Sequence, residues 1–277
     1  MNSEEKKIPI YYFSGTGNSL FVARDIASKI DGEPFNIAPL MKKEKIEIEN
    51  DIIGFSFPIY DFKPAQIMLD FIKKIKKIED KYIFAFGTYG IAPSKAMEVF
   101  SSKLNEIGGK LSLGFAVQMP HNGIGSGIFS QKQHEEMFIN WEKKRPSVLK
   151  NISKRNLQKP QKNKNTDLIK IYILQGTLFK MIPTLSKLMF YVLFHGGWKS
   201  LAFKTNEKCN SCGICEKVCP MKNIKLSNDK PIWGDNCSNC FACIHWCPQS
   251  AVILGPDLNI AEYHHPKIQL SDMIEPK

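Results

Sequence analysis

The sequence predicts an α/β fold with a parallel sheet, followed by a small cysteine-rich domain. Apolar runs alternate with helical patterns over roughly residues 8–155, which is typical of parallel strands connected by helices. All eight cysteines lie after residue 208. The chain has 277 residues, of which 43% are hydrophobic and 23% charged, so it can bury a full core. This composition excludes a disordered or collagen-like chain.

Four apolar runs and one short mixed segment are the expected strands. The apolar runs lack the alternation of half-exposed strands, so they fit strands that helices cover on both faces. The first run is followed by Gly15, and the second, Asp51–Phe57, is closed by Pro58. In chain order the expected strands are Ile8–Phe13, Glu33–Pro39, Asp51–Phe57, Lys81–Phe86 and Lys110–Met119.

Segments with helical periodicity separate these strands. The first ends before Asp31-Gly32, the second has a Lys-rich end that suits the helix dipole, and the third stops at Gly108-Gly109. The fourth contains Pro146, where we expect a kink. The expected helices are Leu20–Ile30, Pro64–Lys77, Pro93–Ile107 and Gln131–Asn156.

The excess of positive charge is confined to the middle of the chain. The net charge is +11, and residues 131–208 hold 16 Lys and Arg against 5 Asp and Glu. The segments on either side are close to neutral. Because no nucleic-acid motif accompanies these cations, we expect no binding of nucleic acid. They favour an acidic redox partner, an anionic membrane surface, or simply a solvated face.

The cysteines form two copies of the pattern C-x-x-C-x-x-C-x-x-x-C-P, 28 residues apart (Cys209 to Cys237). One copy holds Cys209, Cys212, Cys215 and Cys219, and the other holds Cys237, Cys240, Cys243 and Cys247. Three thiolates on one tight loop suit a cubane iron–sulfur cluster, whose fourth ligand arrives from elsewhere. A zinc module shows paired C-x-x-C knuckles without a third nearby Cys, and structural disulfides are rare in the cytosol. The repeat therefore favours iron–sulfur clusters.

This region resembles the bacterial dicluster ferredoxins over Cys209–Leu254. The resemblance implies two [4Fe-4S] clusters, with the fourth cysteine of each copy serving the cluster of the other copy. One cluster would then be held by Cys209, Cys212, Cys215 and Cys247. The other would be held by Cys219, Cys237, Cys240 and Cys243.

A loop rich in Gly and hydroxyl side chains follows the first strand and leads into a helix. Such a loop directs backbone N–H groups at one place, with the helix dipole behind them, and so suits an anion. It lacks the Lys of a Walker loop, and Leu20 stands where a dinucleotide fingerprint has its third Gly. A monophosphate held by neutral donors fits this loop, and the alternative is a turn without a ligand. Its residues are Ser14, Gly15, Thr16, Gly17, Asn18 and Ser19.

The loop and the sheet pattern resemble the flavodoxin family over roughly residues 8–155. The resemblance implies a doubly wound, five-stranded parallel sheet that binds FMN, with the FMN phosphate in the first loop. The flavin ring would lie between the loops after the third and fourth strands, with Tyr60 and Tyr89 as candidates to stack on it. His121, after the fifth strand, lies on the same rim. The candidate ring contacts are Pro58, Ile59, Tyr60, Thr88, Tyr89 and Gly90.

Taken together, the two halves resemble the EFR1 family of flavodoxin–ferredoxin fusions. This implies a flavodoxin-like FMN domain at 1–158, a basic and apolar helical linker at 159–205, an α+β 2[4Fe-4S] ferredoxin domain at 206–255 and a docking tail at 256–277. The expected function is electron transfer between the two clusters and FMN, and to a partner redox protein. The alternatives are an FMN-dependent reductase of a small organic acceptor and a non-catalytic sensor of oxygen or iron.

The linker contains two apolar helical patterns, Leu168–Ile182 and Thr184–His195. Its longest stretch without charge, Leu188–Trp198, is too short to span a bilayer. The patterns favour a bridge between domains, a homodimer contact, or attachment to a membrane surface. The N-terminus lacks a signal-peptide pattern, so we expect a cytoplasmic protein, with peripheral membrane association as an option. The cations that would steer an acidic partner are Lys143, Lys144, Arg145, Lys150, Lys154, Arg155, Lys159, Lys162 and Lys164.

Overall fold

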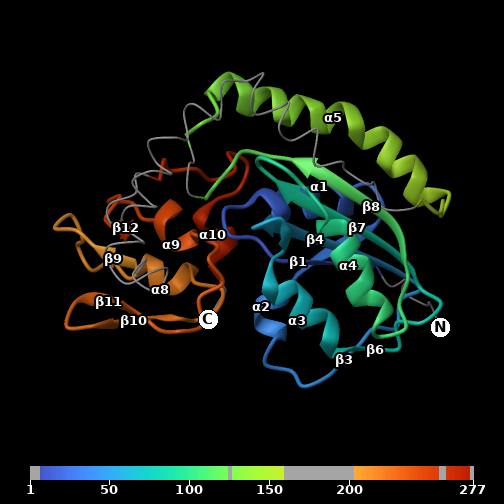
Figure 1. Cartoon of the computed structure of the whole chain (residues 1–277), viewed down its shortest axis with the longest axis horizontal. Helices are drawn as coiled ribbons and strands as arrows, with labels where there is room; N and C mark the ends of the chain where they lie inside the picture. Colours follow the sequence, from blue (N-terminus) through green and yellow to red (C-terminus); the bar gives the residue numbers. More distant parts are fainter. Residues whose placement is uncertain (1–6, 124–126, 159–202, 256–259, 275–277) are drawn as a thin grey trace. The chain divides into compact units, whose positions relative to one another are not determined.

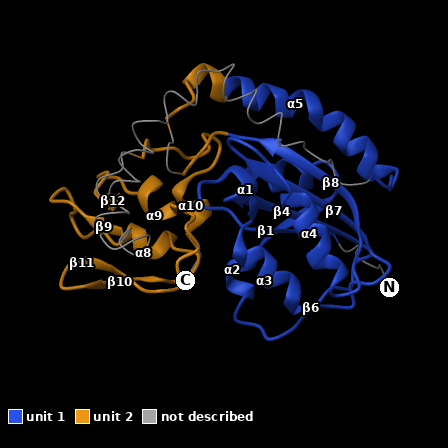
Figure 2. Ribbon diagram, viewed as in Figure 1, with its two compact units in different colours: residues 1–119, 135–164 blue, residues 120–134, 165–277 orange. Residues whose placement is uncertain are grey.

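The computed structural model describes residues 7–123, 127–158, 203–255 and 260–274 (Figure 1). The chain divides into two compact units (Figure 2). The first contains Met1–Met119 and Glu135–Lys164, and the second contains Pro120–His134 and Asn165–Lys277. The two helices predicted in the linker lie outside the described residues. Among the described residues, no helix is both long enough and apolar enough to cross a membrane.

The first unit is built on five parallel strands in the order β2-β1-β4-β7-β8. The first of the five thus lies between the second and the third, which is the flavodoxin-like order of doubly wound sheets. This confirms the predicted fold class. The strands are β1 (Ile8–Tyr12), β2 (Gly32–Asn36), β4 (Ile52–Tyr60), β7 (Tyr82–Tyr89) and β8 (Leu111–Gln118).

Three short strands complete the pairing in this unit. β5 (Lys63–Pro64) pairs antiparallel with the end of β4, and β3 (Ile46–Glu47) pairs with β6 (Ile75–Lys76) away from the main sheet. The helices are α1 (Asn18–Ala27), α2 (Ile37–Leu40), α3 (Gln66–Lys74), α4 (Ala96–Asn105) and α5 (Gln131–Ser153).

Aromatic side chains fill both faces of the main sheet. On one face Phe57 of β4 stacks on Phe100 of α4, with ring centroids 4.6 Å apart. On the other face Phe86 of β7 meets Trp141 of α5 edge to face at 5.9 Å. All four side chains are almost completely buried. Because helices cover both faces, the other four strands are mostly apolar, as their sequences predict, whereas the edge strand β2 carries Glu33 and Asn36.

One strand is longer than its sequence predicts. β4 continues through Pro58 to Tyr60, although Pro58 is expected to close it. The proline lacks an N–H, but its carbonyl accepts a hydrogen bond from the Ala65 N–H at 3.0 Å, so the chain pairs with itself beyond Pro58. The hairpin turn is made by Asp61 and Phe62, whose φ angles are 47° and 63°. As a result, helix α3 begins at Gln66 and not at Pro64.

The second unit repeats one small motif. The helices described in residues 203–255 and 260–274 are α8 (Ile214–Val218), α9 (Ala242–His245) and α10 (Leu270–Met273). Strand β9 (Phe203–Thr205) pairs antiparallel with β12 (Val252–Leu254), and β10 (Ile224–Ser227) pairs antiparallel with β11 (Lys230–Trp233). In the first pair Thr205 lies opposite Val252, and in the second Trp233 lies opposite Ile224. Thr205 and Trp233 are 28 residues apart, as are Ile224 and Val252, so the repeat seen in the sequence is also a structural repeat.

The segment that follows β8 belongs to the second unit. The sequence places residues 1–158 in one domain, whereas residues 120–134 cluster with the cysteine-rich part of the chain. The Asn122 carbonyl lies 2.6 Å from Nε2 of His245, and the His134 ring lies 5.5 Å from that of Tyr263. These contacts join positions more than 120 residues apart in the chain, which local sequence patterns do not reveal.

Candidate iron–sulfur and anion-binding sites

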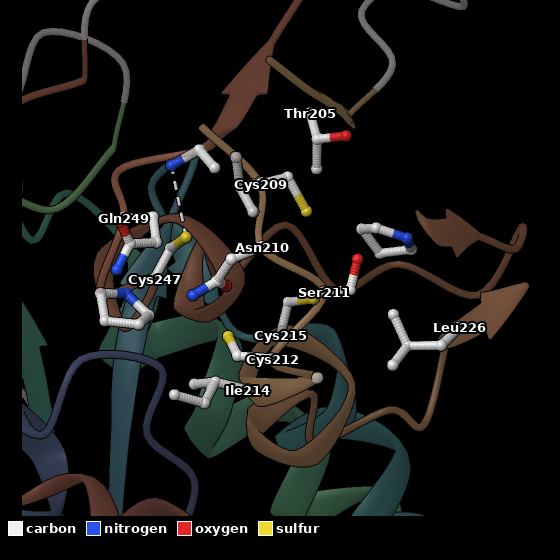
Figure 3. A pocket seen from close by; sticks show the side chains of 15 residues that line it. Thr205, Cys209, Asn210, Ser211, Cys212, Ile214, Cys215, Leu226, Cys247 and Gln249 are labelled. Carbon is white, nitrogen blue, oxygen red and sulfur yellow. Dashed lines mark hydrogen bonds between the residues drawn. The ribbon is translucent and has the colours of Figure 1, made fainter. Parts of the chain in front are cut away.

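The eight cysteines line two cavities of the second unit. Cys209, Cys212, Cys215 and Cys247 line one cavity of about 340 Å³ (Figure 3). Cys219, Cys237, Cys240 and Cys243 line the other, of about 310 Å³. Each cavity thus takes three cysteines from one copy of the repeat and the fourth from the other copy. These are the two sets that the resemblance to dicluster ferredoxins assigns, and none of the eight cysteines forms a disulfide.

Each set of three cysteines is held by the same backbone turn. Ser211 and Gly213 have φ angles of 60° and 72°, and the positions 28 residues later, Asn239 and Phe241, have 52° and 58°. Two left-handed residues turn the loop around the cavity before α8 or α9 begins. Glycine takes this conformation without cost, whereas Phe241 pays roughly 1–2 kcal/mol for it. The second repeat therefore carries a strained Phe241 where the first repeat has an unstrained Gly213.

The surroundings of the thiols suit thiolate ligands of a metal cluster. The Asn223 N–H donates to Sγ of Cys219, and the Ala251 N–H donates to Sγ of Cys247, both at 3.3 Å; Figure 3 draws the second of these bonds. Burial raises the pKa of Cys215 and of Cys240 to about 11, which disfavours an isolated thiolate. A metal ligand must be a thiolate, and the positive charge of a bound metal compensates for the solvation that the buried thiolate has lost. Four thiols around one cavity, with amide donors to the sulfurs, fit the donor set of a [4Fe-4S] cluster.

The candidate anion loop lies between β1 and α1. Gly17 caps the helix with a φ of 93°, and its N–H donates to Oγ of Ser14 at 3.0 Å. The left-handed turn starts α1 at Asn18, two residues before the predicted start at Leu20. The loop carries hydroxyl and amide side chains and no cation, so it offers neutral donors at the positive end of a helix. This arrangement fits a phosphate group.

A buried network fastens this loop to the sheet. Oγ of Ser19 lies 2.7 Å from Oγ1 of Thr88, and the hydroxyl of Ser56 donates to the Ser19 carbonyl at 2.8 Å. Ser19, Ser56 and Thr88 are all at most 3% exposed. Ser19 and Thr88, both predicted as cofactor contacts, therefore have hydroxyls that bond each other. Their evident role is to join the loop to the carboxyl ends of β4 and β7.

The aromatic candidates lie at the same edge of the sheet. Tyr60 ends β4 and Tyr89 ends β7, and these parallel strands are neighbours. Both side chains are half-buried, and burial raises the pKa of Tyr89. The crevice beside the carboxyl ends of such strands is where doubly wound sheets bind ligands. The structure thus brings Tyr60, Tyr89 and the anion loop to one edge of a single sheet.

Other predicted ring contacts have structural roles. A methyl group on Gly87 would lie 2.9 Å from Cδ1 of Ile59 and 3.0 Å from Sδ of Met97, so the Ile59 side chain packs over Gly87. The Gly90 carbonyl accepts a hydrogen bond from the Gln118 side chain at 3.2 Å. Pro58 is buried within β4. At Ile59 and Gly90 the side chain and the carbonyl are thus already engaged by protein neighbours.

Two of the predicted docking cations are engaged inside the first unit. Arg145 donates to the Asp25 carboxylate at 2.9 Å, and Nζ of Lys144 donates to the Ala116 carbonyl at 3.1 Å. Burial lowers the pKa of Lys144. Lys143 and Lys150 on the same helix are exposed, as are Lys154 and Arg155 after it. Lys159, Lys162 and Lys164 lie outside the described residues.

Known proteins are similar to the cysteine-rich part of the second unit. Residues 208–253 match the family profile of the 4Fe-4S dicluster domain. A ferredoxin-like protein in the nif region of Trichormus variabilis is 37% identical over 51 residues, which are 18% of this chain and 44% of that protein. The corresponding protein of Nostoc sp. is 33% identical over the same length. The chain therefore spans less than half the length of the curated relatives it matches.

Solved structures are similar to the other part of the chain. A putative flavoprotein from Bacteroides uniformis is 22% identical, with a TM-score of 0.33 over 40% of this chain and 90% of that one. A flavoprotein in complex with FMN from Lactobacillus acidophilus is 18% identical, with a TM-score of 0.33 over 40% of this chain and 93% of that one. The Megasphaera elsdenii flavodoxin is 20% identical, with a TM-score of 0.31 over 39% of this chain and 84% of that one.

The strand order and the cysteine repeat together define the class of protein. It is a fusion of an α/β unit of flavodoxin-like topology with a small iron–sulfur unit of short antiparallel strands. Residues 208–253 are a 4Fe-4S dicluster domain of the ferredoxin type.

Proposed function

We propose that the protein transfers electrons between two [4Fe-4S] clusters and an FMN. The observation that carries this proposal is the division of the eight cysteines between two cavities of four, in a chain whose other unit has a sheet of flavodoxin-like order. Bound clusters exchange single electrons and FMN one or two, so together they connect one-electron and two-electron chemistry. The protein holds these groups and sets their surroundings.

The first unit would bind the FMN through the loop between β1 and α1. Ser14, Thr16 and Asn18 are the proposed donors to the phosphate, at the positive end of α1. Tyr60 and Tyr89, at the ends of β4 and β7, are the proposed partners of the isoalloxazine ring. Ser19, Ser56 and Thr88 would hold the loop in position through their hydrogen bonds.

A redox protein with an acidic surface is the proposed partner. Lys143 and Lys150 are exposed on helix α5, and Lys154 and Arg155 follow them. Cations grouped in this way attract acidic surfaces and speed encounter at low ionic strength. Lys144 and Arg145 are hydrogen-bonded to groups of the first unit. The acidic protein would therefore be met by the exposed cations named above.

The test is to purify the full chain without oxygen and to count iron, acid-labile sulfide and FMN. After reduction of the clusters, electrons should appear on the flavin without any added substrate, as a loss of flavin absorbance. A Cys219→Ala, Cys247→Ala double variant is the control: it should bind FMN but pass electrons from dithionite to the flavin more slowly. Failure of the parent protein to bind FMN would overturn the proposal.

A further inference from the structure

Trp233 distinguishes one cysteine cavity from the other. The cavity of Cys219, Cys237, Cys240 and Cys243 is also lined by Trp233 and Phe241. Trp233 is the last residue of β11, and its ring stacks beside Phe203 with centroids 6.0 Å apart and planes inclined by 19°. Strand pairing and ring stacking therefore fix the indole in the wall of this cavity.

The indole N–H is a buried hydrogen-bond donor. Nε1 of Trp233 is buried and makes no hydrogen bond of ordinary geometry to any described residue. Buried donors in folded proteins nearly always have a partner. The thiol of Cys243 lines the same cavity as this indole, and a cysteine sulfur can accept a hydrogen bond from an N–H group.

The other cavity has a different residue at the matching position. Thr205 pairs with Val252 as Trp233 pairs with Ile224, so Thr205 is the equivalent of Trp233 in the structural repeat. Thr205 lines the cavity of Cys209, Cys212, Cys215 and Cys247, where Gly213 replaces Phe241. The two cavities thus share the cysteine spacing but have different walls. When the two copies of the cysteine repeat are aligned, Thr205 falls opposite Trp233. The sequence alone could therefore have revealed this difference between the two cavities.

We propose that Trp233 tunes the reduction potential of the cluster held by Cys219, Cys237, Cys240 and Cys243, by donating an N–H···S hydrogen bond to Cys243. The inference rests on the proposed iron–sulfur function. One-electron reduction makes the cluster and its thiolates more negative, and a hydrogen bond to a more negative acceptor is stronger. The donor therefore favours the reduced cluster and raises its potential. Trp233 is a positioning residue in this role, since it acts on the cluster through a ligand.

A Trp233→Phe variant tests this proposal by redox titration of the full chain. Phenylalanine keeps an aromatic ring in the wall and removes the N–H. We expect the midpoint potential of one cluster to become more negative by up to about 59 mV. For one electron, this shift is a tenfold change in the ratio of reduced to oxidised cluster at a fixed potential. The other midpoint should stay in place. The matched control is Thr205→Val, which should leave the Trp233-dependent midpoint unchanged. Midpoints that are equal in Trp233→Phe and the parent protein would overturn the proposal.

A spectroscopic measurement keeps the proposal testable if Trp233→Phe loses its clusters. The parent protein is labelled with nitrogen-15 in its tryptophan side chains, reduced, and studied by pulsed EPR. We expect a nitrogen-15 coupling to the cluster that persists in Trp246→Phe, because Trp246 stacks on His264 at 4.4 Å and lines neither cavity. A fully loaded parent protein without this coupling would overturn the role of Trp233. A parent protein without clusters would instead overturn the proposed function.

Discussion

His245 donates a hydrogen bond from Nε2 to the backbone carbonyl of Asn122 over 2.6 Å. Its Nδ1 accepts the N–H of Tyr263 at 3.1 Å, so the ring proton must lie on Nε2 and the ring is neutral. Burial, the largest cause, lowers the pKa of His245 to about 4, in keeping with a neutral ring. This side chain therefore joins three parts of the second unit: the segment after β8, helix α9 with its cysteine, and the C-terminal tail.

Replacement of His245 by Phe should destabilise the second unit by about 1–3 kcal/mol. The ring volume is kept, but the hydrogen bonds to the Asn122 carbonyl and from the Tyr263 N–H are lost, and the loss of two part-buried hydrogen bonds carries a cost of about this size. Thermal loss of the cluster absorbance, together with limited proteolysis within residues 120–134, measures the change. The control is His264→Phe, which keeps a ring stacked on Trp246 and should behave like the parent protein. Equal behaviour of the two variants would contradict the role of His245.

The sequence predicted what depends on local pattern. The apolar runs identified four strands of the main sheet, because strands covered on both faces are predominantly apolar. The cysteine spacing marked the two loops of three thiols, and the resemblance to dicluster ferredoxins assigned the fourth cysteine that lines each cavity. Both signals are contained in short stretches of chain, where the residue type alone decides the outcome.

What the sequence did not reveal depends on contacts between distant residues. Asn122 meets His245 across 123 positions, and this moves residues 120–134 into the second unit. Arg145 meets Asp25 across 120 positions, so a cation assigned to docking is an internal partner. Strand β4 passes Pro58 because Ala65 supplies a hydrogen bond from beyond the turn. In the first two cases a partner far along the chain decided the outcome, and in the third a partner just beyond the turn did.

Asp25 should be the most sensitive acidic residue of the first unit. Its carboxylate accepts from Nε1 of Trp141 at 2.7 Å and from Arg145 at 2.9 Å, and its side chain is 13% exposed. Asp25→Ala would leave a buried indole N–H and a partly buried guanidinium without their acceptor, at about 2–4 kcal/mol. Urea titration of the full chain, followed by tryptophan fluorescence, gives the free energy of unfolding.

The control for Asp25 is an ion pair of similar length on the surface. Asp70 pairs with Lys73 at 2.7 Å, but their side chains are 39% and 53% exposed. Asp70→Ala should therefore cost much less than Asp25→Ala, since water solvates both groups when the pair is broken. Comparable losses in the two variants would show that Asp25 does not anchor helix α5.

Acidification should weaken the second unit through His265. Burial, with smaller contributions from Lys267 and His264, lowers the pKa of His265 to about 3, and the side chain is 1% exposed. The unfolded chain binds a proton near pH 6.5 and the folded chain does not, so stability is lost as the pH falls below 6.5. This amounts to about 2 kcal/mol at pH 5. The unfolding free energy should fall less between pH 7.5 and pH 5 in His265→Gln than in the parent protein, by the amount attributed to His265. An equal fall in the two proteins would show that His265 does not cause the acid sensitivity.

Gly17 should matter for flavin binding beyond its effect on stability. Its φ of 93° is a left-handed conformation that alanine adopts at a cost of about 1–2 kcal/mol. Gly17→Ala would displace the start of α1 and the N–H groups beside the loop, so we expect FMN affinity to fall at least tenfold. Gly108→Ala is the matched control, because Gly108 has a φ of 84° but lies after α4. Both variants should lose stability in urea, and only Gly17→Ala should lose flavin in a fluorescence titration.

The exchange of fourth cysteines between the two repeats can be tested with pairs of substitutions. Cys237 and Cys219 line one cavity, whereas Cys237 and Cys247 line different cavities. Cys237→Ala combined with Cys219→Ala should therefore remove one cluster and leave about half of the iron and sulfide. Cys237→Ala combined with Cys247→Ala should damage both sites and leave little of either. If each repeat instead supplied all four ligands of its own cluster, the two double variants would show the opposite iron contents, since Cys247 shares a repeat with Cys237 and Cys219 does not.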